Sequence, residues 1–122
     1  MKSYTDLEQS KKLAEILSLE SADMHWQYIE EDNGQLQWFC FPKDFSINQH
    51  NKVSAWSLAA LLDVIPLEVE THKQTDGHKI YYYVESYMKR NGKEIYQSTE
   101  RHENLIDACY EMIIRLNKLK LV

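Results

Sequence analysis

Residues 80–88, IYYYVESYM, alternate between two kinds of side chain, which is the pattern of an extended strand with one covered face. Aromatic and β-branched side chains fit such a pleated, half-buried surface. Turn signals stand on both sides of the stretch, Asp76-Gly77 before it and Asn91-Gly92 after it. The pattern therefore predicts the central strand of a three-stranded antiparallel meander.

The two turns assign the residues of this meander to two faces. A turn centred on Asp76-Gly77 places Val69 opposite Val84, and a turn centred on Asn91-Gly92 places Met88 opposite Ile95. One face is then mostly apolar and holds Leu67, Val69, Thr71, Ile80, Tyr82, Val84, Met88 and Ile95. The other, called here the tyrosine face, holds Glu68, Glu70, His72, Tyr81, Tyr83, Glu85, Tyr87, Tyr96 and Ser98. We expect helices to cover the apolar face and solvent to reach the tyrosine face.

Apolar residues at helical spacing predict three helices. The first opens at Thr5-Asp6-Leu7-Glu8, a capping box with Thr5 as the cap. The second runs over residues 55–63 behind a Ser54 cap. The third runs over residues 105–119 behind Asn104, and its broad apolar stripe predicts docking on the apolar face of the meander.

Two further strands, Met24 to Glu30 and Leu36 to Phe41, are predicted on either side of Asp32-Asn33-Gly34. If Asn33-Gly34 forms a two-residue turn, Tyr28 faces Phe39. A turn one residue longer would change the partners and regroup the two faces of this hairpin. The pattern leaves open both this register and whether the hairpin joins the meander in one sheet.

The element order α-β-β-α-β-β-β-α contains no strand–crossover–strand repeat that would require a parallel sheet. It predicts a single α+β domain over residues 1–122, built of two layers: a twisted antiparallel sheet with the helices packed on one face. The polar stretch from Pro42 to Lys52 is the longest predicted loop, and its role stays open.

Charge and composition narrow the class of protein. The chain has 122 residues, and its 14 basic and 19 acidic residues give a net charge of −5, which argues against nucleic-acid binding through phosphate neutralisation. The polar amino-terminal stretch MKSYTDLEQSKK lacks the apolar run of a signal peptide, and no apolar segment approaches the roughly 18 residues that span a bilayer. We therefore expect a soluble, cytoplasmic protein without membrane association.

The residues capable of catalysis or metal binding occur without a recognisable motif. Cys40 and Cys109 stand in apolar settings, outside any C-x-x-C pair, and are predicted to be free thiols with little reactivity. The five histidines show no metal-ligand spacing along the chain: His25, His50, His72, His78 and His102. We expect no catalytic, cofactor-binding or metal-binding residues, and a protein that is not an enzyme.

The tyrosine face is the candidate interaction surface, because tyrosine combines a large apolar ring with a hydrogen-bonding tip. Its candidate contact residues are Tyr81, Tyr83, Tyr87, Tyr96 and His72. The pattern favours a non-enzymatic module that binds a protein partner or a second copy of itself. A ladder that only stabilises the sheet is the structural alternative.

A further alternative is a nucleic-acid-binding sheet with basic hairpin ends, supplied by Lys73, Lys79, Lys89, Arg90 and Lys93. The glutamates of the tyrosine face argue against that alternative. A small enzyme without a recognisable motif is the remaining one.

Three stretches carry a resemblance: Tyr4 to Met24, Trp56 to Pro66, and Asp107 to Leu116. In this order they resemble a group of small uncharacterised proteins encoded by prophages and other mobile elements of gut bacteria. The resemblance implies a phage-type accessory protein. It implies no activity, cofactor or catalytic residue, since none is established for the group.

Overall fold

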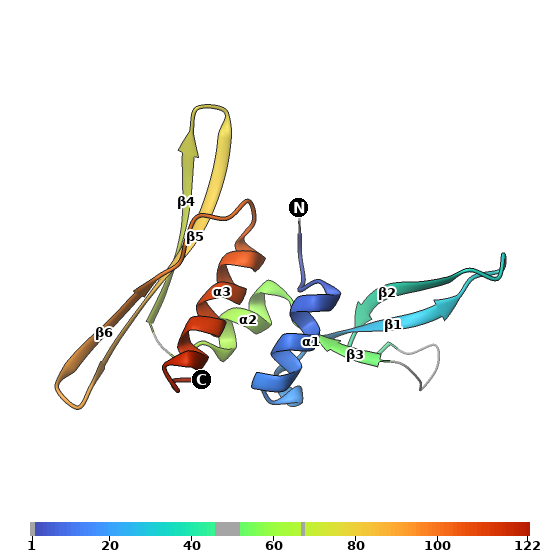
Figure 1. The fold of residues 1–122 in the computed structure, drawn as a ribbon, viewed down its shortest axis with the longest axis horizontal. Coiled ribbons are helices and arrows are strands. Elements are labelled where there is room, and N and C mark those ends of the chain that lie inside the picture. Colours follow the sequence, from blue (N-terminus) through green and yellow to red (C-terminus); the bar gives the residue numbers. More distant parts are fainter. Residues whose placement is uncertain (1, 46–51, 67) are drawn as a thin grey trace.

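In the computed structural model, which describes residues 2–45, 52–66 and 68–122, three α-helices lie between two three-stranded antiparallel sheets (Figure 1). The helices are α1 (Leu7–Ile16), α2 (Leu58–Val64) and α3 (Leu105–Lys118), and a short 3-10 helix spans Leu19–Ser21. The strands are β1 (Met24–Glu30), β2 (Leu36–Pro42), β3 (Lys52–Ala55), β4 (Glu68–Asp76), β5 (Lys79–Arg90) and β6 (Lys93–Ser98). Within these described residues, every helix is too short or too polar to cross a membrane.

The α+β class is confirmed, but the strands do not form one sheet. One sheet has the order β2-β1-β3 and the other the order β4-β5-β6. The helix α3 packs on β5, α2 packs on α3, and α1 packs on β3, so the helices separate the two sheets (Figure 1). The expected arrangement of a single sheet with helices on one face therefore holds only for the meander.

The strand β3 was not predicted, and the second helix begins later than expected. Ser54 lies within β3, and Ser57 is the actual cap of α2, with its hydroxyl accepting a hydrogen bond from Ala60 N. Asp23 fixes this start, because its carboxylate accepts from the Ser57 backbone N–H at 2.8 Å and also bonds the Ser57 hydroxyl. Pairing of β3 with β1 then holds Ser54 in extended conformation. The predicted loop from Pro42 to Lys52 lies largely outside the described residues.

The capping box of α1 is shifted by one residue from the predicted position. Asp6 is the cap and accepts from Gln9 N at 2.8 Å, while the Gln9 side chain accepts from Asp6 N at 3.1 Å. Thr5 has another role, because it is fully buried and its Oγ1 accepts from the backbone N–H of Trp56 at 3.1 Å. The predicted cap thus joins the chain before α1 to the chain before α2.

The β1–β2 hairpin adopts the longer of the two turns considered. Residues 31–35 connect the strands, and a hydrogen bond of 2.7 Å from Glu31 N to Gln35 O closes a three-residue turn, Asp32-Asn33-Gly34. Gly34 has φ +82°, a value that glycine adopts without strain. Tyr28 therefore faces Trp38 instead of Phe39, and their rings stack with centroids 5.0 Å apart. Of the two turns left open by the sequence, the structure has the longer one, and the faces of this hairpin are grouped accordingly.

For the described residues, the two faces of the meander are as predicted, although one register differs. Leu67, predicted on the apolar face, lies outside those residues. The first turn consists of Gly77 and His78, so Thr71 pairs with Val84 and each partner is two residues from its predicted position. A shift of two preserves the alternation of side chains, so no residue changes face. The Asn91-Gly92 turn pairs Met88 with Ile95 as predicted.

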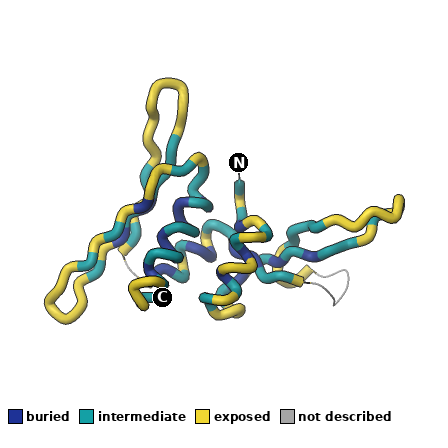
Figure 2. Tube along the Cα trace, in the orientation of Figure 1, coloured by how far each residue is buried: buried dark blue, intermediate teal, exposed yellow. Residues whose placement is uncertain are grey.

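Helix α3 covers only the middle of the apolar face. Val84 and Met112 are fully buried in one apolar cluster, whereas Ile80 near the hairpin tip is 43% exposed. A helix of 14 residues is about 21 Å long, while a strand of 12 residues extends about 40 Å, so both hairpin ends extend past the helix (Figure 2). The centre of the tyrosine face therefore has a rigid support behind it.

Candidate functional site

The tyrosine face lies on the side of the β4-β5-β6 sheet that points away from α3. Alternation along β5 fixes this orientation, because Val84 and Ser86 are buried under the helix while Tyr83, Glu85 and Tyr87 point to the other side. The buried side is anchored by the Ser86 hydroxyl, which lies 3.2 Å from the Met112 sulfur. The outer face therefore stands on a well-packed strand.

The five candidate residues share this face but form separate contacts. His72 lies opposite Tyr83, and the two rings stack with centroids 4.5 Å apart and planes 7° apart. Tyr87 lies opposite Tyr96 across the second hairpin. Tyr81 stands apart from these pairs, with the guanidinium of Arg101 4.8 Å from its ring centroid.

The phenol groups at one end of the face are bonded to carboxylates. Tyr96 donates to Glu85, and this hydrogen bond is the main reason that the pKa of Tyr96 is raised to about 12. Tyr87 donates to Glu94 at 3.2 Å, and partial desolvation together with this bond raises the pKa of Tyr87. Tyr96 is nevertheless 57% exposed, so it presents ring surface to solvent while its hydroxyl is occupied.

These residues border a pocket of about 320 Å³, called here the acidic pocket. The residues of the tyrosine face that line it are Glu68, Glu70, Glu85, Tyr87 and Tyr96. Three carboxylates and two exposed aromatic rings therefore surround one shallow space. Such a lining favours a cationic ligand with an apolar or planar part.

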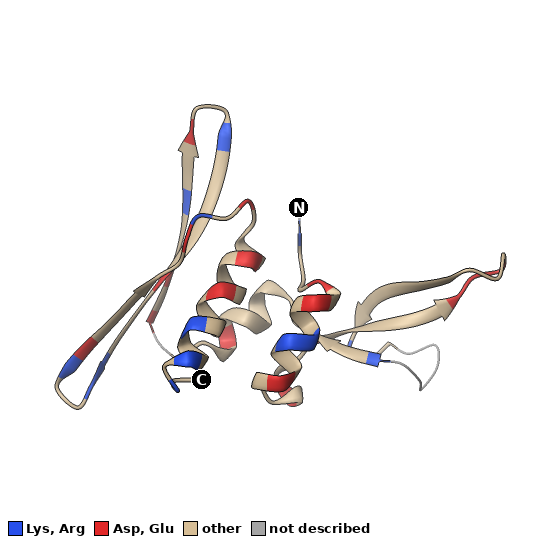
Figure 3. Ribbon diagram, viewed as in Figure 1, with Lys and Arg blue, Asp and Glu red and all other residues tan. Residues whose placement is uncertain are grey.

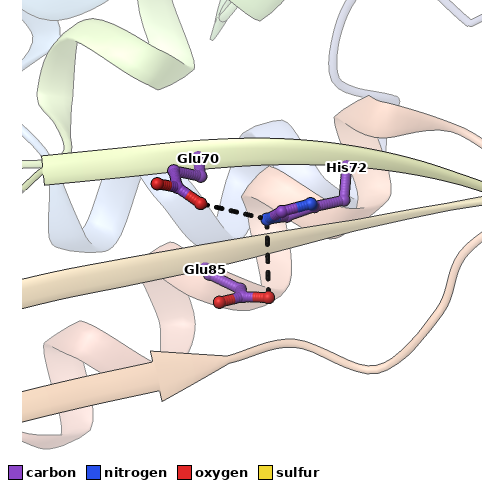
Figure 4. A group of neighbouring side chains, drawn as sticks. All are labelled: Glu70, His72 and Glu85. Atoms are coloured by element: carbon purple, nitrogen blue, oxygen red, sulfur yellow. Dashed lines mark ion pairs between the residues drawn. The ribbon is translucent and has the colours of Figure 1, made fainter.

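A cluster of three side chains at the edge of this pocket was not predicted from the sequence. Glu70 and His72 project from β4, and Glu85 projects from β5 toward both of them (Figure 4). His72 Nε2 lies 3.4 Å from a carboxylate oxygen of Glu70 and 3.4 Å from one of Glu85. Ligand spacing along the chain does not reveal this cluster, because its groups meet across a strand pair. Their predicted location on one face was the available signal.

The other candidates for chemistry do not converge with the tyrosine face. Within the described residues, Glu70, His72 and Glu85 are the only such group close enough to hold a metal ion, and His50 lies outside those residues. Both cysteines are free thiols, as predicted. Burial and the nearby Asp23 raise the pKa of Cys40 to about 11, and burial raises the pKa of Cys109 to about 12.

The predicted basic residues lie at opposite ends of the long sheet (Figure 3). Lys73 and Lys79 belong to the β4–β5 end, while Lys89, Arg90 and Lys93 belong to the β5–β6 end. The glutamates of the acidic pocket lie between the two groups. The face is therefore not a continuous basic surface.

A second group of charged side chains lies between α1 and α3, at a pocket of about 400 Å³. Asp107 accepts hydrogen bonds of 2.8 Å from Lys2, Gln9 and Asn104. Glu111 lies 2.8 Å from His102 Nε2 and accepts from Arg115 Nε at 2.6 Å. Every one of these contacts is internal, which identifies the group as a structural clamp.

The clamp predicts a loss of stability in acid. Burial raises the pKa of Asp107 and Glu111, but the hydrogen bonds to their charged forms outweigh it, so both pKa values lie below their ordinary 3.8 and 4.5. Stabilisation from a lowered pKa is complete above the ordinary value and disappears as the pH falls through the folded one. We expect the Tm of an Asp107→Asn/Glu111→Gln variant to start lower and fall less than that of the wild type from roughly pH 7 to pH 3.

Asp32→Asn, in an exposed turn, is the control and should keep the wild-type profile. Equal falls of Tm with pH in the wild type and the double variant would contradict the stabilising role of the Asp107 and Glu111 carboxylates. Differential scanning calorimetry across this pH range measures the Tm at neutral pH and its fall toward pH 3.

The candidate site is thus a rigidly supported sheet face on which exposed tyrosines surround glutamates. Its two features are the acidic pocket and the Glu70, His72, Glu85 cluster, which share Glu70 and Glu85. Comparison of the chain with protein-family models, curated proteins and solved structures found no significant match.

Proposed function

We propose that the protein is a non-enzymatic interaction module whose tyrosine face binds a basic, arginine-bearing segment of a partner protein. One observation carries this proposal: exposed Tyr87 and Tyr96 border a pocket that three glutamates line, on a sheet face that no helix of the described residues covers. In keeping with the resemblance to prophage-encoded proteins, we propose an accessory role in the cytoplasm.

The tyrosines of this face are suited to a guanidinium group. Arg101 already places its guanidinium 4.8 Å from the centre of the Tyr81 ring. A planar cation over an aromatic ring is stabilised by about 0.5 to 2 kcal/mol, depending on exposure. Tyr87 and Tyr96 offer the same ring surface next to carboxylates that can bond a guanidinium in pairs. An arginine side chain would therefore meet both of its preferred partners in the acidic pocket.

The charge of the face disfavours the other occupants considered. A second copy would bring the same glutamates face to face, and like charges across an interface weaken binding. A nucleic acid would have to pass its phosphates over the acidic pocket to reach both basic ends of the sheet. A basic protein segment meets neither obstacle.

Titration of the 15N-labelled protein with synthetic peptides tests the proposal by NMR. An arginine-rich peptide should shift amide signals of β4, β5 and β6, and a glutamate-rich peptide of equal length should not. In a Tyr87→Ser/Tyr96→Ser variant the affinity should fall at least about tenfold, because aromatic anchors dominate interfaces of this kind. Both rings lie outside the apolar core, so the variant should keep its fold.

Tyr28→Ser is the matched control, since Tyr28 stacks on Trp38 in the other sheet. It should bind the arginine-rich peptide as the wild type does. Equal affinity of the double variant, preferential binding of oligothymidylate, or dimerisation through this face by light scattering would each contradict the proposal.

A further inference from the structure

We propose that Glu70, His72 and Glu85 form a binding site for a divalent transition-metal ion, with zinc as the best fit. The three side chains come from the neighbouring strands β4 and β5, and their ligand atoms all lie within 4.8 Å of one another (Figure 4). This inference goes beyond the proposed binding of a protein segment.

The first argument is the pairing of like charges. Glu70 and Glu85 are direct partners in the register of β4 and β5. Carboxylates directly opposite each other on a sheet repel and destabilise the strand pair. A cation between them removes that repulsion. The position of His72, two residues from Glu70 on the same face, supplies a nitrogen ligand at that point.

The second argument is the state of the imidazole nitrogen. His72 Nε2 is shielded from solvent and has no hydrogen-bond partner in the described structure, although two carboxylate oxygens lie 3.4 Å away. A single N–H cannot point at both oxygens at once, and neither contact has hydrogen-bond geometry. An ion that lies between the three groups can contact all of them, because coordination directs each ligand toward one centre.

The distances fit the coordination of zinc. Zinc bonds of about 2.0 to 2.2 Å to nitrogen and oxygen, at tetrahedral angles, place neighbouring ligand atoms about 3.3 to 3.6 Å apart. The two nitrogen–oxygen distances of 3.4 Å agree with this spacing. Glu70 has an exposed side chain and can move to bring the third distance into range.

Neighbouring side chains hold two of the ligands in place. The Tyr96 hydroxyl bonds Oε2 of Glu85 and leaves Oε1 directed at His72. The Tyr83 ring stacks on the imidazole with only 7° between the planes, which limits its rotation. Such supporting contacts orient metal ligands and raise affinity.

The donor set selects among metals. One imidazole with two carboxylates suits zinc and similar transition ions, whereas magnesium favours an all-oxygen shell. Three protein ligands leave a fourth position of a tetrahedral site open to water or to an external ligand.

Isothermal titration calorimetry of chelator-treated protein with Zn²⁺ alone tests the site. We expect one bound ion per chain, with affinity at least about tenfold lower in His72→Gln. His78→Gln, in the turn of the same hairpin, is the matched control and should bind as the wild type does. Long-range 1H–15N NMR of the imidazoles should show that Zn²⁺ shifts the His72 Nε2 signal.

Equal Zn²⁺ affinity in His72→Gln and the wild type would overturn the proposal. So would Mg²⁺ binding as tight as Zn²⁺ binding, because it would indicate attraction to carboxylates alone. An unchanged His72 Nε2 signal would also overturn it, because the ion would then bind without the imidazole. The test uses the metal without peptide, so its failure is distinct from failure of the proposed protein binding.

Discussion

Replacing Trp56 by alanine is expected to lower the free energy of unfolding by about 3 to 5 kcal/mol, a large part of the 5 to 15 kcal/mol typical of a folded domain. Trp56 is fully buried, and its indole N–H donates to the Ser21 hydroxyl at 2.9 Å. Its backbone bonds Thr5 in both directions. The truncation would leave a cavity where the amino-terminal segment, the 3-10 helix and the start of α2 meet.

Urea denaturation followed by circular dichroism measures this effect without relying on tryptophan fluorescence. Trp38→Ala is the matched control, because Trp38 is only half-buried and stacks on Tyr28 in the β1–β2 hairpin. Trp38→Ala should lower the free energy of unfolding by about 1 kcal/mol, the contribution of an aromatic pair. Equal losses in the two variants would contradict a core centred on Trp56.

Two adjacent residues of β5 should respond very differently to the same change. Val84→Ser is expected to destabilise the protein by about 2 to 4 kcal/mol, since it removes buried apolar volume and places a hydroxyl under α3. Tyr83→Ser should lower the free energy of unfolding by less than about 1 kcal/mol, because Tyr83 lies on the face away from α3 and its main loss is the stacking on His72. The contrast tests which face of the meander the helices cover.

Thermal and urea unfolding of both variants provide the measurement. Comparable destabilisation of the two would mean that the tyrosine face is packed against another part of the chain. A greater loss for Tyr83→Ser would reverse the assignment of the faces. In either case the tyrosine face would not be accessible to a binding partner.

The meander shows why a face is easier to predict than a register. Placing the first turn at Asp76-Gly77 instead of Gly77-His78 moves every partner by two residues, and the side-chain period of two keeps each residue on its face. In the β1–β2 hairpin, the turn is one residue longer than the two-residue alternative, so every partner moves by one residue. Tyr28 then meets Trp38 instead of Phe39, and the faces regroup.

The short elements were the least predictable. β3 has four residues, too few to show a period, and its extended conformation depends on pairing with β1. Ser54 and Ser57 are both suitable helix caps by residue type. Asp23 decides between them by bonding Ser57, and that contact joins residues 34 positions apart. Local pattern carries no information about such a contact.

The residues of the candidate site could be predicted from the sequence, but the contacts between them could not. Alternation along β4 and β5 placed His72, Glu70 and Glu85 on one face. It did not indicate that both carboxylates approach one imidazole nitrogen, since that depends on the register and on rotamers. The chemistry of the site therefore became visible only with the strand pairing.

The division of six strands between two sheets leaves four outer strands in the described residues, where a single sheet would leave two. β4 and β6 carry lysine and glutamate, which discourage pairing with another chain. β2, with the sequence LQWFCFP, has no charged residue. β3 is only four residues long and carries Lys52. Among the outer strands of the described residues, β2 is therefore the one whose free edge is most open to intermolecular strand addition in a concentrated solution.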